Sequence, residues 1–217
     1  MKLAYIINTR LPTEKAHGYQ VVKMCEALAL EGIETLLCYP FRHQSEALME
    51  KNIFDFYGVG HIFQNKMMPN WDLLPHFDNK LYHVLQTTIW SGWAMFQLRK
   101  EGVDLYYTRD ILIALWLAFF GFPVIYEEHA MVGKWGQFFL KGVSQKSSLK
   151  AVVALTHFIK NKFIELEFPP KKLIVASDGV DLAMFKNLPD KTNCRRRLDL
   201  PHTLSIVGYI GRFKVFG

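Results

Sequence analysis

Apolar runs of strand length recur along this chain, and longer segments with helical periodicity separate them. The runs are apolar on both faces, as strands are when helices cover both sides of a parallel sheet. Right-handed crossover connections arrange such a chain as a doubly wound sheet. The sequence therefore predicts an α/β fold with a doubly wound, Rossmann-like parallel sheet. The predicted strands span 2–8, 33–40, 103–110, 122–128 and 151–156, and 172–181 is a predicted strand and turn. The main predicted helices span 19–30, 79–100, 111–120 and 157–167.

Composition narrows the class of protein. Half of the 217 residues are hydrophobic, which is typical of a chain that builds a folded core, and the net charge of +6 favours phosphates or anionic surfaces without selecting one partner. The longest apolar stretch, 111–126, is broken by Gly121 and Pro123 and is shorter than the roughly 20 residues of a membrane helix. The first ten residues suit a strand better than a signal peptide, and three widely spaced cysteines suit free thiols in a reducing compartment. These features predict a cytoplasmic protein.

Polar clusters follow the predicted strands at the points where the strands end. Ligands of doubly wound sheets bind at the carboxyl ends of the strands, so these clusters are expected to share one site. They are the loop NTRLPTEKAHG after the first strand, then TRD (108–110), EEHA (127–130), THF (156–158) and SDGVD (177–181).

The EEHA cluster places two carboxylates and an imidazole at the end of a buried strand. A buried carboxylate needs a partner, and alternate residues of a strand point to opposite faces, so structural satisfaction accounts for one of the two acids. His129 lies beyond the strand and is harder to explain structurally. We therefore expect His129 to be a site residue and Glu128 to lie at the cleft.

The two preceding clusters carry a cation and a glycine. Arg109 pairs with Asp110 or Asp104, or it contacts a phosphate or sugar, while Asp110 is placed to cap the next helix. Gly18 precedes a helix whose free amides can meet an anion, although a simple turn residue explains it as well. No GxGxxG fingerprint of dinucleotide binding is present.

The last part of the chain changes character. Residues 183–202 contain prolines and the basic run Arg195–Arg197, and they read as a polar, helix-like linker. Residues 204–210 read as a new apolar strand, and Gly211 and Arg212 follow it, where amides and a guanidinium could grip a diphosphate. We expect 1–182 to be one domain and 203–217 to be the first strand and turn of a second domain. An unpaired strand at 204–210 also predicts self-association.

The order and spacing of these motifs resemble the family-4-type retaining glycosyltransferases of GT-B architecture, over the first half of such an enzyme. SDGVDLAMF (177–185) is similar to the family segment NGVD-x-x-x-F, with Ser177-Asp178 where Pro-Asn or Ser-Asn is more usual. VGYIGRF (207–213) is similar to the family segment that contains Gly-Arg. Lys214 comes earlier than the family lysine, and no second-lobe E-x(7)-E motif follows it in this sequence.

The resemblance implies transfer of a sugar from a nucleotide-diphosphate sugar to a glycan, polysaccharide or lipid acceptor, as in cell-envelope polysaccharide biosynthesis. It implies that Gly18, Gly211 and Arg212 lie near the donor diphosphate and that His129 reaches the transferred sugar. Arg109 and Glu128 would lie at the acceptor cleft, by strand-end geometry. Such a site needs no metal or cofactor. As the chain stands, we expect little transferase activity, because most donor-binding groups belong to the second lobe.

Other interpretations stay open at this point. The chain could be a non-catalytic acceptor-binding lobe that completes an enzyme with a separate C-terminal lobe, or another nucleotide-binding Rossmann-like enzyme, such as an oxidoreductase. The aromatic and basic residues of 66–100 fit either an acceptor-side or membrane-surface patch, peripheral to the inner face of the membrane, or the core and boundary of a long helix. No nucleic-acid fold signature accompanies the arginine run, so a solvated linker is the better explanation of it, and no nucleic-acid partner is expected.

Overall fold

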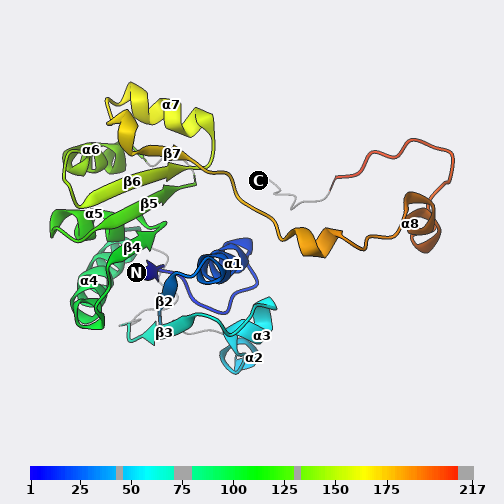
Figure 1. Cartoon of the computed structure of the whole chain (residues 1–217), viewed down its shortest axis with the longest axis horizontal. Coiled ribbons are helices and arrows are strands. Elements are labelled where there is room, and N and C mark those ends of the chain that lie inside the picture. The colour runs from blue at the N-terminus through cyan, green and yellow to red at the C-terminus, as the bar shows by residue number, and fades with distance from the viewer. Residues whose placement is uncertain (43–45, 71–79, 130–132, 210–217) are drawn as a thin grey trace. The chain divides into compact units, whose positions relative to one another are not determined.

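The computed structural model describes residues 1–42, 46–70, 80–129 and 133–209 (Figure 1). The chain divides into two units, Met1–Ser177 and Asp178–Gly217. Four of the five polar clusters at the strand ends lie wholly in unit 1. The fifth, SDGVD (177–181), is divided, with Ser177 in unit 1 and the rest in unit 2. Each unit is described by itself.

Unit 1 is built on a seven-stranded sheet in which every neighbouring pair of strands is parallel, in the order β3-β2-β1-β4-β5-β6-β7. This sheet confirms the predicted α/β fold of the doubly wound, Rossmann-like type. The strands are β1 (Lys2–Ile6), β2 (Glu34–Pro40), β3 (Gln64–Met68), β4 (Leu105–Thr108), β5 (Val124–Glu128), β6 (Leu149–Ala154) and β7 (Leu173–Val175).

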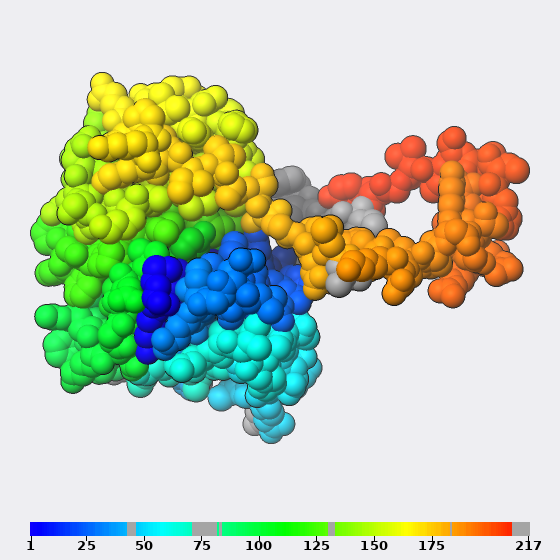
Figure 2. Space-filling model, viewed as in Figure 1, coloured from blue at the N-terminus to red at the C-terminus, as the bar shows by residue number. Residues whose placement is uncertain are grey.

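Helices cover both faces of the sheet, as the doubly apolar strands require. Figure 1 shows α1 and α3 on one side and α4, α5 and α6 on the other, and the space-filling view shows α1 (blue) beside α3 (cyan) (Figures 1 and 2). The helices of unit 1 are α1 (Ala16–Leu30), α2 (Glu46–Met49), α3 (Ile53–Tyr57), α4 (Lys80–Leu98), α5 (Ile111–Phe119), α6 (Lys134–Val143) and α7 (His157–Glu165), with 3₁₀ turns η1 (Arg99–Glu101) and η2 (Pro170–Lys172).

Two apolar clusters form the core, one on each face of the sheet. Tyr5 and Leu37 pack on the α1 face with Val22, and the opposite face buries Ile6 with Trp90 and other residues of α4 to α7. Successive residues of one strand thus enter different clusters, which is the alternation expected of a strand buried on both sides.

The chain reverses its direction of travel across the sheet at β1. From β1 it moves outward to β2 and β3, and α4 then carries it back to β4, which pairs with the other side of β1. The carboxyl ends of β1 and β4 therefore flank the topological switch point, the place where doubly wound folds bind their ligands.

Two parts of the chain differ from the sequence prediction. β3 is absent from the predicted strands; it lies at the edge of the sheet, and its polar Gln64-Asn65-Lys66 is tolerated because an edge strand is only partly covered. The segment 204–210 was expected to be a strand, but its described residues 204–209 belong to none, since a strand exists only with a hydrogen-bonded neighbour. Self-association through that segment stays a prediction.

Unit 2 contains the 3₁₀ turn η3 (Leu182–Phe185) and the helix α8 (Lys191–Arg197), whose first turn is capped by the Asp190 carboxylate. Throughout the described ranges, no helix is both long enough and apolar enough to cross a bilayer.

Candidate functional site

A buried carboxylate, Glu127 at the end of β5, lies at the centre of the polar residues near the switch point. Its side chain is 2% exposed and faces α1. One oxygen, Oε1, accepts from Arg109 Nη2 at 2.9 Å and contacts His129 Nε2 at 2.7 Å. The other, Oε2, accepts from the Tyr107 hydroxyl at 2.6 Å, with the Tyr5 hydroxyl at 3.5 Å. We call these five residues the Glu127 cluster.

The strand register brings the cluster together. β1 and β4 pair with Tyr5 opposite Tyr107, and the two rings meet edge to face at 4.8 Å. β5 lies beside β4 with Ile125 opposite Tyr107, so Glu127 extends one pleat further on the same face. Arg109 leaves the end of β4 and also donates to Gln20 of α1, at 3.0 Å. The cluster therefore ties together three strands and the first helix.

Glu127 and Arg109 are both charged at neutral pH. Burial alone would raise the pKa of Glu127, but the hydrogen bonds from His129, Arg109 and Tyr107 outweigh it and lower the pKa to about 2. Burial likewise tends to lower the pKa of Arg109, and the neighbouring Tyr5 and Glu127 reverse this and raise it. Burial raises the pKa of Tyr5 well above its ordinary value, so that hydroxyl stays protonated. Glu127 and Arg109 thus form a buried ion pair.

His129 connects this buried pair to the surface. Its side chain is 32% exposed, just beyond the last residue of β5. An ionised carboxylate only accepts hydrogen bonds, so the 2.7 Å contact assigns the proton to Nε2. In a neutral ring Nδ1 is then an acceptor. Glu127 therefore fixes both the orientation and the tautomer of His129.

A cavity of about 150 Å³ lies beside the cluster. It has two buried polar atoms without a hydrogen-bond partner among the described residues, the donor Arg109 Nε and the ring nitrogen His17 Nε2. Burial, together with Lys15, Arg109 and Arg10, lowers the pKa of His17, which favours a neutral ring. A ligand rich in acceptor oxygens would satisfy such a cavity. We call it the switch-point cavity, and its described lining residues are Ile7, Asn8, Thr9, His17, Val21, Arg109 and Asp110.

Gly18 lies in the first turn of α1 and has a packing role. A Cβ at this position would lie 2.4 Å from both Thr13 Cγ2 and the Tyr57 hydroxyl oxygen. That hydroxyl is held in place, because it accepts from Thr13 N at 2.7 Å and donates to Thr13 O at 2.9 Å. The glycine thus allows α3 to clamp the loop that leads into α1. Its role near a donor diphosphate stays a prediction.

The other predicted site residues lie in different places. Glu128 is 2% exposed and points to the opposite face of the sheet, where it accepts from the Tyr126 hydroxyl at 3.1 Å. Arg109 pairs with Glu127, and not with the expected Asp110 or Asp104. Asp110 does cap α5, accepting from Leu112 N at 2.9 Å. Gly211 and Arg212 lie outside the described residues.

Sequence reasoning missed four members of this region: Glu127 as the central acid, the two tyrosines beside it, and His17. The tyrosines looked like ordinary strand residues, and only the pairing of Tyr5 with Tyr107 shows that they share a face with Glu127. His17 stood in the quoted first loop, but no spacing rule distinguishes a histidine in the first turn of a helix from a surface residue.

No family model matches the sequence, and no curated protein matches it at the sequence level. Solved structures match its fold. Sucrose-phosphate synthase from Thermosynechococcus elongatus superposes with a TM-score of 0.62 at 12% identity, over 92% of this chain and 53% of that chain. HepE from Anabaena, solved in complex with UDP and glucose, gives 0.56 at 15% identity, over 92% and 50%.

The fold is shared more widely. UDP-GlcNAc 2-epimerase from Neisseria meningitidis, bound to UDP-GlcNAc, gives a TM-score of 0.51 at 15% identity, over 81% of this chain and 46% of that chain. This chain thus spans about half the length of the proteins it resembles. Among these neighbours are glycosyltransferases of GT-B architecture, and the α/β sheet of this chain has the fold of one half of such a protein.

Proposed function

We propose that this chain forms the N-terminal, acceptor-side lobe of a retaining GT-B glycosyltransferase. The transferred sugar would come from a nucleotide-diphosphate sugar. The observation that carries the proposal is the Glu127 cluster at the switch point, which presents an oriented imidazole beside a cavity whose buried polar atoms include Arg109 Nε and His17 Nε2, without a hydrogen-bond partner among the described residues. The neighbours add support, because HepE was solved with UDP-glucose and with UDP.

Within this proposal His129 holds a hydroxyl of the transferred sugar and acts as a positioning residue, not as a base. Glu127 keeps its ring in one orientation and one tautomer, and Arg109 compensates the charge of Glu127. Preorganised groups of this kind stabilise charge that develops in a transition state without having to reorganise. Glu128 takes no part in our version of the site, because it belongs to the opposite face.

Stabilisation of the leaving diphosphate falls to Gly211 and Arg212, on the resemblance of their segment to the family. The domain limits of 1–182, 183–202 and 203–217 are part of the same proposal. So are a glycan, polysaccharide or lipid acceptor, a role in cell-envelope polysaccharide synthesis, and a reaction that needs no metal. Because the chain spans about half of its structural neighbours, the complete reaction is proposed for the whole enzyme and low activity is expected for this chain alone.

Saturation-transfer NMR with UDP-glucose tests the proposal, because it detects weak binding and reports which part of a ligand touches the protein. We expect the glucose protons to receive more saturation than the uracil protons, since the sugar faces this lobe. His129→Ala should abolish most of the glucose signal, while His61→Ala, at a histidine before β3 whose side chain is 61% exposed, should leave it unchanged.

Three results would contradict the proposal: no saturation transfer to UDP-glucose at millimolar concentration, saturation of the uracil protons alone, or equal effects of the two histidine variants on the glucose signal. Incubation with UDP-GlcNAc in the absence of an acceptor is the second arm. Conversion of that nucleotide sugar to its 2-epimer would replace sugar transfer by epimerisation, which the same fold supports in other proteins.

A further inference from the structure

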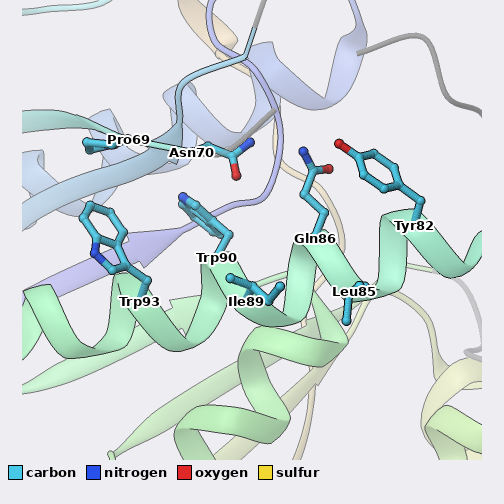
Figure 3. A pocket seen from close by; sticks show the side chains of 8 residues that line it. All are labelled: Pro69, Asn70, Tyr82, Leu85, Gln86, Ile89, Trp90 and Trp93. Atoms are coloured by element: carbon cyan, nitrogen blue, oxygen red, sulfur yellow. The ribbon is translucent and has the colours of Figure 1, made fainter. Parts of the chain in front are cut away.

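A second cavity, of about 280 Å³, lies between α4 and the residues that follow β3. We call it the α4 cavity. Figure 3 shows the side chains that line it, with the ring of Trp93 facing Pro69, the ring of Trp90 facing Asn70 and the amide of Gln86 directed to the same side as Asn70 (Figure 3). The described lining residues are Pro69, Asn70, Tyr82, Leu85, Gln86, Ile89, Trp90 and Trp93.

The walls of this cavity are mainly apolar and partly open. Leu85 is 57% exposed and Ile89 is 50% exposed, although both lie on the cavity side of a 19-residue helix. Helices normally turn such residues toward the core, and exposed apolar surface beside a cavity indicates a binding partner. The size is near the lower end of small-molecule sites, at about 300 Å³.

Two buried donors inside the cavity lack a hydrogen-bond partner among the described residues. One is the indole Nε1 of Trp90, a side chain that is only 3% exposed, and the other is Nδ2 of Asn70. A buried donor without a partner destabilises the site, so the site favours a ligand that brings an acceptor oxygen. A cation lies near this end, since Arg42 Nη1 donates to the Gln86 amide oxygen at 3.3 Å.

The same arginine connects the α4 cavity to the switch-point cavity. Arg42 Nη2 donates to Asn8 Oδ1 at 2.7 Å, and Asn8 Nδ2 donates to Thr87 Oγ1 at 2.5 Å. Asn8 lines the switch-point cavity and Gln86 lines the α4 cavity. One hydrogen-bonded wall therefore separates the two spaces, and a ligand in the α4 cavity would present its polar end toward the proposed site of sugar transfer.

We propose that the α4 cavity binds the aliphatic chain of an amphiphilic phosphate, with the phosphate at the Asn70, Gln86 and Arg42 end. An apolar chain fits better than a sugar, because each sugar hydroxyl would need a partner that most of these walls do not offer. That the amphiphile is the acceptor, a lipid-linked one, rests on the proposed function. The binding of the amphiphile does not.

Decyl phosphate, kept below its micellar concentration, is the probe for this site. Titration followed by calorimetry and tryptophan fluorescence should give saturable binding, because two of the five tryptophans line the cavity. Decanol should bind about two- to tenfold more weakly, since it lacks the anionic oxygens. Inorganic phosphate and maltotriose should not bind at this site.

Two exposed positions on α4 provide a matched pair of variants. Ile89→Lys puts an ammonium group on the cavity wall and should weaken decyl phosphate binding by at least about tenfold through lost apolar burial. Phe96→Lys changes a residue of the same helix that is 56% exposed and does not line the cavity, and it should bind as the unchanged protein does. Trp90→Phe keeps an aromatic ring without the N–H and should reduce the preference for decyl phosphate over decanol.

The proposal is wrong if circular dichroism shows folded protein and no saturable binding occurs. It is also wrong if maltotriose binds in place of decyl phosphate. Equal loss of binding in both lysine variants would contradict it as well, since that would indicate non-specific adsorption of decyl phosphate on the exposed apolar surface of α4. The UDP-glucose experiment is read separately. If decyl phosphate binds but the glucose protons of UDP-glucose receive no saturation, the α4 cavity is a binding site but the proposal that it holds the acceptor fails. If the glucose protons receive saturation but decyl phosphate does not bind, the proposed sugar transfer stands and its acceptor binds elsewhere.

Discussion

Replacing Glu127 by glutamine tests the reasoning about the Glu127 cluster. The amide keeps the size of the side chain but removes the charge that Arg109 and His129 contact. Breaking a buried ion pair on one side typically costs about 3–5 kcal/mol. The pKa of Glu127, lowered from 4.5 to about 2, gives a comparable figure of roughly 3 kcal/mol at 1.36 kcal/mol per pKa unit. We therefore expect a loss of about 3 kcal/mol at pH 7.

The sign of the pH dependence follows from the direction of the shift. The pKa is lower in the folded protein, so the stabilisation is fully present above the unfolded value of 4.5 and is lost as the pH falls toward 2. Linkage predicts that this contribution has decreased by about 0.8 kcal/mol at pH 4 and by about 2 kcal/mol at pH 3. The difference between the unchanged protein and Glu127→Gln should narrow by these amounts.

Urea unfolding followed by far-ultraviolet circular dichroism at pH 7, 4 and 3 measures both quantities. Glu34→Gln is the control, because Glu34 pairs with Lys2 at 3.5 Å but its side chain is 58% exposed, and it should cost under about 1 kcal/mol. The reasoning fails if Glu127→Gln costs no more than this control. It also fails if the difference between Glu127→Gln and the unchanged protein is the same at pH 7 and pH 3.

Three further outcomes follow from packing, capping and burial. Gly18→Ala should destabilise unit 1 by about 1–3 kcal/mol, because the new methyl group overlaps two fixed neighbours. Gly142→Ala, in α6 and with open space around it, should stabilise the protein by about 0.5–1 kcal/mol. Urea midpoints measure both changes, and a shift in the same direction for both variants would contradict the steric argument. Asp110→Ala should cost about 1 kcal/mol through the lost cap of α5, and Asp110→Asn should recover most of it in the same assay. Of the three thiols, only that of Cys194 should react rapidly with a disulfide reagent at pH 8, because the other two are buried with raised pKa values; fast reaction of all three in folded protein would contradict this.

Most of the sheet could be predicted from the sequence, because a strand that is covered on both faces must be apolar throughout. Six of the seven strands were predicted from such apolar runs. The exception, β3, lies at the sheet edge with Gln64, Asn65 and Lys66 in it, and its pairing with β2 depends on backbone hydrogen bonds that leave no trace in composition. β7, at the opposite edge, is apolar and was predicted, so β3 escaped prediction because of its polar residues and not because of its edge position alone.

The candidate site could be predicted only in part. That His129 and Arg109 lie near each other follows from parallel strands, whose carboxyl ends share one edge of a sheet, and both contact the same carboxylate. Strand alternation alone pairs His129 with Glu127 and not with Glu128, because residues two apart share a face. What does not follow from the sequence is that the Tyr5 and Tyr107 hydroxyls lie on this same face, since that requires the register of three strands.

The spacing of two residues between Glu127 and His129 explains how one short segment is both buried and exposed. Residues two apart on a strand share a face, so the imidazole and the carboxylate can meet. Because β5 ends at Glu128, Glu127 still lies under α1 while His129 has already passed the edge of the sheet. A spacing of one would send the two side chains to opposite faces, as happens to Glu128. A larger spacing would remove the ring from the rigid strand that orients it. The E-x-H pattern at the end of β5 is therefore a geometric requirement for holding an exposed imidazole by a buried anion.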